Sequence, residues 1–166
     1  MNVSLEPWEA GDEPLLHKLL GDPAMMEHLG GAESPEKIAD RHQRYLTLPE
    51  GDRMFKIVSD DGEAVGSVGY WQTEHHNEPV YETGWFVLPA FQGQGIATAA
   101  TRQAIELAAA ERRNRWIHAF PSVTNPASNA ICRKLGFELV EADMEFEYPK
   151  GHLLVVNDWR LELVGG

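Results

Sequence analysis

Hydrophobic and polar residues follow two different periods along the first part of the chain. A short segment at residues 2–8 predicts a strand. Residues 11–20 then carry leucines at spacings that place them on one face of a helix. At residues 34–36 the run Ser-Pro-Glu has the order of an N-cap, a first helical position and an acid that matches the helix dipole. A second helix is therefore predicted to run to about Tyr45.

The middle of the chain has the pattern of β-strands. Three segments rich in β-branched and aromatic residues, at 53–59, 64–72 and 80–88, predict a three-stranded meander. The pair Asp61-Gly62 between the first two segments is typical of a hairpin turn.

The last part of the chain returns to alternating helices and strands. It predicts a helix at residues 96–112, a strand at 115–120 and a capped helix at 125–136. A closing hairpin follows at residues 137–163 and turns around residues 149–151. The complete order is strand, two helices, three strands, helix, strand, helix and two strands. It indicates a mixed α/β (α+β) fold, and we expect a single domain over residues 1–166.

Composition sets outer limits on the kind of protein. The chain has 166 residues, of which 43% are hydrophobic, enough for a core of its own. Cys132 is the only cysteine, so no disulfide can form within the chain. The first residues lack the pattern of a secretory signal, and no apolar run approaches the roughly 20 residues that span a bilayer. We therefore expect a cytoplasmic protein with no membrane-spanning segment.

The charge narrows the range of partners. The formal net charge is −12, with 26 acidic and 14 basic residues. Phosphate contacts need clustered lysine and arginine, so we expect no nucleic-acid partner. An acidic protein favours a cationic substrate, although the same charge also serves simply to keep a protein in solution.

Two glycines separated by one residue, Gly93 and Gly95, lie between a predicted strand and a predicted helix. Such a turn exposes backbone N–H groups beside the positive end of a helix and suits a phosphate group. A nucleoside triphosphate loop requires Gly-Lys-Ser/Thr, whereas Ile96 and Ala97 follow Gly95. A dinucleotide fold requires a third small residue, where Thr98 stands, and an acid after the next strand, which has none. We interpret the turn as a pyrophosphate site.

Two motifs resemble those of one enzyme family. The segment FQGQGIAT matches the Gln/Arg-x-x-Gly-x-Gly/Ala signature of the GNAT superfamily of N-acetyltransferases, with Gln92, Gly95 and Ala97 at the defining positions. The segment NPASNAICRKLGF, from Asn125 to Leu-Gly-Phe at 135–137, resembles the later helix motif of that family. The pattern is most similar to the branch of ribosomal-protein N-terminal acetyltransferases and small-amine or antibiotic acetyltransferases. The resemblance implies a mixed, mostly antiparallel sheet of about seven strands flanked by about four helices.

The resemblance also implies acetyl-CoA as cosubstrate. Its pantetheine arm is expected along a strand segment, its pyrophosphate on the amides of the glycine turn, and an asparagine near the arm. The cofactor-binding residues so assigned are Trp85, Phe86, Val87, Gln92, Gly93, Gln94, Gly95, Ile96, Ala97, Thr98 and Asn125.

Glu82 is the candidate general base. Family members often carry a carboxylate in the strand before the cofactor turn, where it deprotonates the acceptor amine through water. By alternation, Glu82 should share one face of its strand with Phe86, opposite Tyr81 and Trp85. A carboxylate that only orients the substrate, or is simply exposed, is the alternative interpretation.

Ser128 is the candidate that protonates the leaving thiolate. Many GNAT enzymes use a tyrosine three residues before the Leu-Gly-Phe triplet, and this chain has Cys132 there. In the branch that the chain resembles, the serine of Asn-x-x-Ser lies near the thioester sulfur. Cys132 itself is expected to be a small buried residue.

The predicted reaction is direct attack of a primary amine on acetyl-CoA in a ternary complex. A small cationic amine is the first choice of acceptor, and a protein N-terminus or lysine is the alternative. A non-catalytic acyl-CoA sensor remains a third interpretation. No metal is expected, because the consecutive Glu74, His75 and His76 rarely converge on one ion. A monomer or homodimer is expected, with a small-molecule amine or a peptide as partner.

Overall fold

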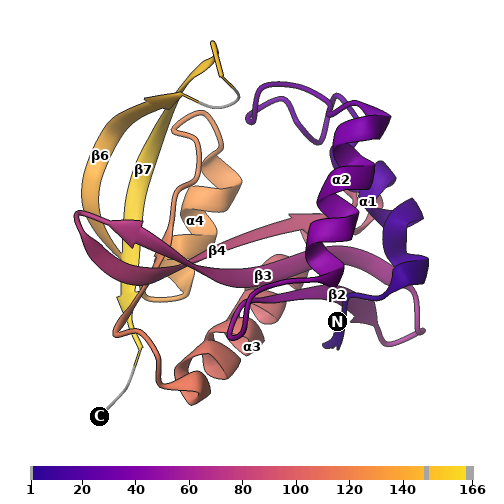
Figure 1. The fold of residues 1–166 in the computed structure, drawn as a ribbon, viewed down its shortest axis with the longest axis horizontal. Coiled ribbons are helices and arrows are strands. Elements are labelled where there is room, and N and C mark those ends of the chain that lie inside the picture. Colours follow the sequence, from indigo (N-terminus) through magenta and orange to yellow (C-terminus); the bar gives the residue numbers. More distant parts are fainter. Residues whose placement is uncertain (1, 148–149, 164–166) are drawn as a thin grey trace.

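The computed structural model describes residues 2–147 and 150–163. The chain builds one seven-stranded sheet and four α-helices (Figure 1). The strands are β1 (Val3–Pro7), β2 (Arg53–Ser59), β3 (Ala64–His75), β4 (Glu78–Val87), β5 (Trp116–Ala119), β6 (Glu138–Glu147) and β7 (Leu153–Glu162). The helices are α1 (Glu13–Leu20), α2 (Pro35–Leu46), α3 (Ile96–Glu111) and α4 (Pro126–Lys134), with short 3-10 turns at Ala10–Asp12 and Pro89–Phe91.

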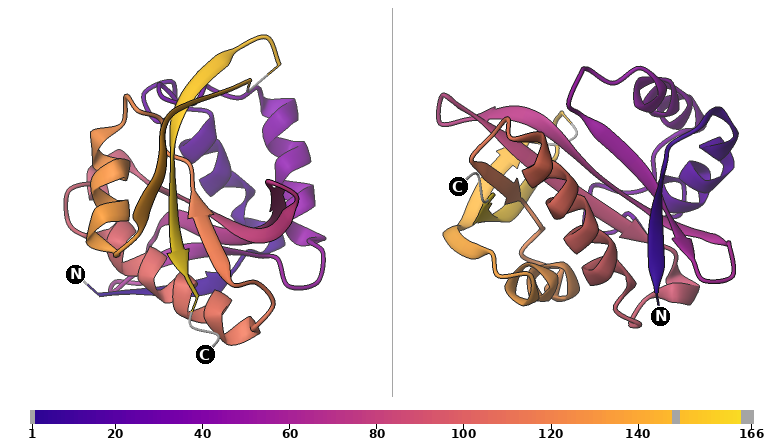
Figure 2. Two further views of the ribbon diagram at one scale, coloured as in Figure 1. Left: turned by 90° about the vertical axis from the view of Figure 1, so that its left-hand side faces the viewer. Right: turned by 90° about the horizontal axis from the view of Figure 1, so that it is seen from below.

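The sheet has the strand order β1-β2-β3-β4-β5-β7-β6. The pair β4–β5 is parallel and the other neighbours are antiparallel. Helices α1 and α2 pack against one part of the sheet, and α3 and α4 lie on the opposite side, as Figure 2 shows. The mixed, mostly antiparallel sheet and the predicted order of elements are therefore confirmed.

The two helical layers have different side chains at the sheet. Helix α3 turns a stripe of fully buried alanines toward the strands, formed by Ala100, Ala104 and Ala108. These small side chains let the helix backbone approach the sheet closely. On the other side, α1 fills a second core with four buried leucines, and Phe86 of β4 packs against that core.

The sheet divides between β4 and β5. These two strands pair at only two register positions in the described chain, Tyr81 with Ile117 and Glu82 with His118. Beyond Glu82, β4 continues beside β3 toward the glycine turn, whereas β5 continues beside β7. The sheet therefore has two arms. The β4 arm contains β3 and β4 and runs across the molecule in Figure 1, and the β5 arm contains β5, β7 and β6, of which β6 and β7 stand upright there. Glu82 and His118 mark the point where the arms separate.

The structure differs from the predicted closing hairpin in one strand. The pairing of β6 with β7 is not continuous, because its register shifts twice, between Leu139 and Glu141 and between Glu141 and Met144. Asp143 lies at the second shift with a positive φ of 56°. A bulge adds a residue to one strand and so interrupts the alternation that sequence patterns assume. Residue 148 of the predicted strand and residue 149 of the predicted turn lie outside the described chain.

No helix in the described part of the chain is long and apolar enough to cross a lipid bilayer.

Candidate active site

The glycine turn lies exposed between the end of β4 and the start of α3. Gly93 and Gly95 have φ values of 76° and 80°, in the left-handed region that favours glycine. A Cβ at either position would meet no atom within 4 Å. Glycine is therefore favoured here by the backbone conformation and not by a lack of room for a side chain. Gly95 is the N-cap of α3, and its carbonyl accepts from the N–H of Ala99 at 3.1 Å. The N–H groups of residues 96–98 therefore precede the first intrahelical bond and can bind an anion at the helix N-terminus.

Two glutamines hold this turn in place. Gln92 donates through Nε2 to the Val87 carbonyl at 2.9 Å and lies 3.5 Å from the sulfur of Met25. Gln94 donates through Nε2 to the Ala90 carbonyl at 3.4 Å. Both side-chain amides thus bond to the protein backbone. Their expected part in cofactor binding would be to fix the shape of the turn.

The last residues of β4 point alternately to the two cores, as the alternation predicted. Tyr81 and Trp85 pack on the α3 side, whereas Phe86 packs on the side of α1 and α2. Val87 is buried at the end of the strand, next to the turn. Trp85, Phe86 and Val87 therefore form the end of the β4 arm that leads into the glycine turn.

Asn125 and Ser128 come together at the start of α4. Asn125 is the N-cap, and its Oδ1 accepts from the backbone N–H of Ser128 at 3.1 Å. The Asn-x-x-Ser spacing thus has a local structural cause, since a cap residue serves an N–H group of the first turn. The Ser128 side chain is half-buried in the first turn of α4, the helix that follows β5 in the chain.

Cys132 is fully buried in the core that α3 and α4 share. Burial raises the pKa of its thiol to about 12, against which the nearby Arg133 charge acts only weakly. The thiol therefore stays protonated and shielded from solvent, as expected of a small buried residue.

Glu82 lies on β4 between Trp71 of β3 and His118 of β5. Burial raises the pKa of its carboxyl to about 7, while a hydrogen bond from Trp71 and the charge of His118 act in the opposite direction. The Trp71 ring extends over Gly84, where an added Cβ would lie 3.3 Å from the indole. Glu82 thus sits where the sheet divides, and its carboxyl changes protonation state near neutral pH.

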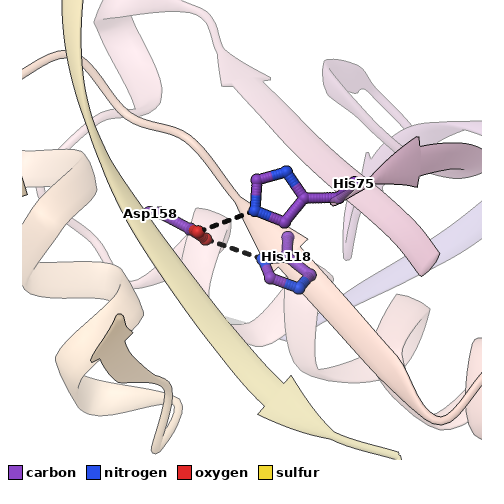
Figure 3. Close-up of side chains that lie close together, drawn as sticks. All are labelled: His75, His118 and Asp158. Atoms are coloured by element: carbon purple, nitrogen blue, oxygen red, sulfur yellow. Dashed lines mark hydrogen bonds and ion pairs between the residues drawn. The ribbon is translucent and has the colours of Figure 1, made fainter. Parts of the chain in front are cut away.

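A second polar cluster lies beside Glu82, formed by His75, His118 and Asp158 from β3, β5 and β7 (Figure 3). His118 Nδ1 lies 2.6 Å from Asp158 Oδ1, and His75 Nε2 lies 3.0 Å from Asp158 Oδ2. Asp158 has no exposed surface. Burial alone would raise the pKa of Asp158, but hydrogen bonds and charge from His118 and His75 outweigh burial and lower the pKa.

The ionised carboxylate fixes the roles of both rings. A carboxylate without its proton can only accept, so His118 donates through Nδ1–H and His75 through Nε2–H. The three residues each offer one ligand atom within 4.8 Å of the others, a spacing that could also hold a metal ion.

This cluster was not predicted from the sequence. His75 was considered only together with its neighbours Glu74 and His76, whereas its actual partners, His118 and Asp158, are more than 40 positions away. One signal was available: His118 interrupts an apolar strand, and Asp158 interrupts another. Buried polar residues in strands require hydrogen-bond partners, which the sequence does not identify.

The segment between α1 and α2 contacts both arms of the divided sheet. Met25 touches Gln92 on the β4 arm, and His28 Nδ1 lies 2.7 Å from Thr124 Oγ1 on the β5 arm. Thr124 in turn shares a hydrogen bond of 2.8 Å with Ser122. The segment therefore bridges the division of the sheet.

Two adjoining cavities lie along this same segment and helix α2. The larger has a volume of about 400 Å³ and mixed charge, with Lys37, Arg44 and Lys150 among its basic residues and Asp40 among its acids. The smaller, of about 80 Å³, shares part of its lining with the first and reaches Phe86 on the face of β4 that carries Glu82. Neither cavity is lined by Glu82 itself. Together they lead from the surface toward that face of the strand.

Comparison with known families gives a match over most of the chain. Residues 2–138 match the family model of the acetyltransferase (GNAT) domain. The spermidine N(1)-acetyltransferase of Escherichia coli strain K12 is 25% identical over 150 residues, covering 89% of this chain and 78% of that protein.

Solved structures share the complete fold. The spermidine N-acetyltransferase of Vibrio cholerae, in complex with CoA and spermine, superposes with a TM-score of 0.81 at 18% identity, covering 97% of this chain and 95% of that one. An acetyltransferase of Salmonella typhimurium that modifies the N-terminal serine of ribosomal protein L7/L12 gives a TM-score of 0.78 at 26% identity, covering 98% and 95%.

Proposed function

The chain belongs to the GNAT acetyltransferase family, and we propose that it transfers an acetyl group from acetyl-CoA to the primary amine of a small cationic acceptor. The reaction is a direct attack of the amine on the thioester in a ternary complex. The observation that carries this proposal is Glu82, a crowded carboxylate with a pKa of about 7 at the point where the sheet divides. The spermidine acetyltransferases among the similar proteins support a cationic acceptor.

The glycine turn fits a pyrophosphate. Its glycines hold left-handed backbone conformations with open space at the missing Cβ, and the first N–H groups of α3 face outward there. Residues 92–98 and Asn125 would hold the cosubstrate, with the pantetheine arm beside residues 85–87. Backbone dipoles suit this task in a chain of net charge −12, because they attract a polyanion without lysine or arginine.

Glu82 would take the proton of the acceptor amine. An alkylamine with a pKa near 10.4 is neutral about once in 2,500 molecules at pH 7, which costs about 4.6 kcal/mol, whereas an α-amine near pKa 8 costs about 1.4 kcal/mol. A carboxylate whose pKa lies near 7 is both partly ionised at neutral pH and basic enough to accept that proton.

Ser128 would return a proton to the leaving thiolate. It is half-buried in the first turn of α4, and Asn125 orders that turn as its cap. Cys132, which occupies the position of the family tyrosine, is fully buried with a pKa near 12 and is therefore a poor donor.

A peptide N-terminus is the second candidate acceptor. The larger cavity combines Lys37, Arg44 and Lys150 with two acidic residues, a lining that suits an acceptor with acidic groups beside its amine. The ribosomal-protein acetyltransferase among the similar structures supports the same candidate.

Release of free thiol from acetyl-CoA over a panel of amines tests these proposals. The panel contains spermidine, spermine, an aminoglycoside, a lysine peptide and peptides with serine at the N-terminus. We expect acetylation of a polyamine, and Glu82→Gln should lower that activity much more than activity on α-amines. Glu78→Gln, an exposed acid on the same strand, is the matched control. Preference for a peptide would select the second candidate, and tight CoA binding with no acetylated amine would leave only the sensor interpretation.

A further inference from the structure

Acetylation of an ammonium group releases two protons from one nitrogen. The overall change is R–NH₃⁺ plus acetyl–S–CoA to R–NH–acetyl, HS–CoA and H⁺. One proton ends on the thiol, and the other leaves to solvent. A single carboxylate holds one proton at a time, so a Glu82 that takes both protons from the nitrogen has to pass on the first before it accepts the second. The site therefore benefits from a second proton acceptor next to Glu82.

His118 lies in the place that such an acceptor requires. It is the register partner of Glu82 across the parallel pair β4–β5, so the two residues are backbone neighbours at the division of the sheet, with no hydrogen bond or ion pair between their side chains in the described chain. Its Nδ1 is engaged with Asp158 at 2.6 Å, and its other nitrogen lies on the side of the ring away from Asp158 (Figure 3). With Nδ1–H donated, Nε2 carries a lone pair that can accept a proton.

We propose that His118, positioned by Asp158, is the second acid–base residue of this active site and relieves Glu82 of the proton taken from the acceptor amine. The transfer passes through a bridging water molecule: the O–H bond of protonated Glu82 breaks as the water takes that proton, and the water gives one of its own protons to form an N–H bond at His118 Nε2. Glu82 is again a carboxylate, and His118 is an imidazolium that faces the Asp158 carboxylate. His118 is buried, so the imidazolium returns the proton to solvent through the same bridging water between turnovers. This inference rests on the proposed role of Glu82 as base.

The charges around His118 favour this transfer. Glu82 faces it from β4, Asp158 and Arg160 from β7, and His75 from β3. Arg160 is directed elsewhere, since it bonds to Glu138 at 2.9 Å and lies over the Trp116 ring. A protonated His118 therefore lies between two carboxylates, Glu82 and Asp158. The pKa of about 7 at Glu82 means that its carboxyl gives up a proton readily near neutral pH.

The pairing of His118 with Asp158 has the geometry of a carboxylate–histidine pair in acid–base catalysis. A buried carboxylate that accepts from Nδ1–H fixes the tautomer of a histidine and stabilises its charged form, while Nε2 handles the transferred proton. Asp158 meets the description, because it is fully buried, has a lowered pKa and accepts from His118 at 2.6 Å. Phe120 stacks on His118 at 5.7 Å and 11°, which further limits rotation of the ring.

His118→Asn tests the proposal because asparagine keeps an N–H donor where Nδ1 stands and carries no acid–base group. We expect kcat for the best amine of the wild type to fall about 100-fold, within the range of general acid–base catalysis, while acetyl-CoA affinity by calorimetry stays unchanged. Asp158→Asn, which removes the carboxylate, should give a similar loss, and the double variant should lose no more than either alone. His152→Asn is the matched control, because His152 is exposed and precedes β7, outside the cluster.

The outcomes separate this inference from the proposed function. A folded His118→Asn with kcat within threefold of the wild type, alongside an inactive Glu82→Gln, would overturn the role of His118 and leave the proposed function intact. A wild type that acetylates no amine would overturn both. Activity that disappears in EDTA and returns with Zn²⁺ would identify the cluster as a metal site and also overturn the acid–base role. If His118→Asn fails to fold, Asp158→Asn carries the same comparison.

Discussion

Replacing Glu82 with glutamine should stabilise the protein at alkaline pH while removing its base. The folded-state pKa of Glu82 is about 7, above its ordinary value of 4.5, because burial disfavours the charge. Below pH 4.5 the carboxyl is neutral in both the folded and the unfolded chain, so its ionisation does not lower the free energy of unfolding. Between pH 4.5 and 7 the unfolded chain releases the proton and the folded chain retains it. Stability is therefore lost progressively over this window and stays lower above pH 7.

The size of the effect follows from the two pKa values. At about 1.36 kcal/mol per pKa unit, the difference between 4.5 and about 7 corresponds to about 3 kcal/mol at pH 8. Glutamine has nearly the same shape and keeps a carbonyl oxygen as acceptor for Trp71, but it never ionises. For a chain of this length, about 3 kcal/mol corresponds to a rise in Tm of roughly 6–12 °C.

Thermal unfolding of the wild type and Glu82→Gln from pH 5 to pH 8.5, followed by circular dichroism, measures this difference. The two proteins should melt within about 2 °C of each other at pH 5 and diverge through pH 7. Subtracting the Tm of the wild type from that of Glu82→Gln at each pH cancels the contribution of every other titrating group. Glu78→Gln, exposed on the same strand, should show no such divergence. A Tm difference that is the same at pH 5 and pH 8 would refute a buried, late-titrating Glu82 and with it the reason for naming this residue as base.

Three further substitutions test other parts of the site. Ser128→Ala should lower kcat about tenfold or more and leave acetyl-CoA affinity by calorimetry unchanged; unchanged kcat would remove Ser128 from the mechanism. Gly95→Ala strains a φ of 80° by about 1 kcal/mol and should weaken CoA binding several-fold, and unaltered affinity would contradict the turn as pyrophosphate site. Asn129→Leu leaves the N–H groups of half-buried Asn157 and buried Trp159 without their acceptor, so urea unfolding should show a loss of about 3 kcal/mol; a loss below about 1 kcal/mol would contradict this network.

The parts of the fold that could be predicted are those with local causes. The glycine turn was recognisable because Gly93 and Gly95 supply left-handed backbone that other residues adopt only with strain. The start of α4 was recognisable because Asn125 caps the helix on which it stands. The alternation along β4 correctly placed Trp85 and Phe86 on opposite faces. In each case the deciding interaction lies within a few residues of its signal.

The parts that escaped prediction depend on pairing between distant strands. His118 lies beside Glu82 only because β4 and β5 pair in one parallel register, and it meets Asp158 only because β7 is inserted between β5 and β6. Neither fact leaves a local trace in the sequence. The bulge at Asp143 escaped for a related reason, since a register shift is a property of two strands and the periodicity of one strand cannot show it.

We propose that the acceptor side of the site is also built from interactions between distant segments, which would let one fold serve different amines. The V. cholerae spermidine acetyltransferase and the S. typhimurium ribosomal-protein acetyltransferase both superpose on this chain over nearly its whole length. What differs among such enzymes must therefore lie in side chains and connecting segments rather than in the sheet. In this chain the segment between α1 and α2 touches the β4 arm through Met25 and the β5 arm through His28, and residues from it line both cavities. Changes in that segment can alter the acceptor while the division of the sheet keeps Glu82 and His118 side by side.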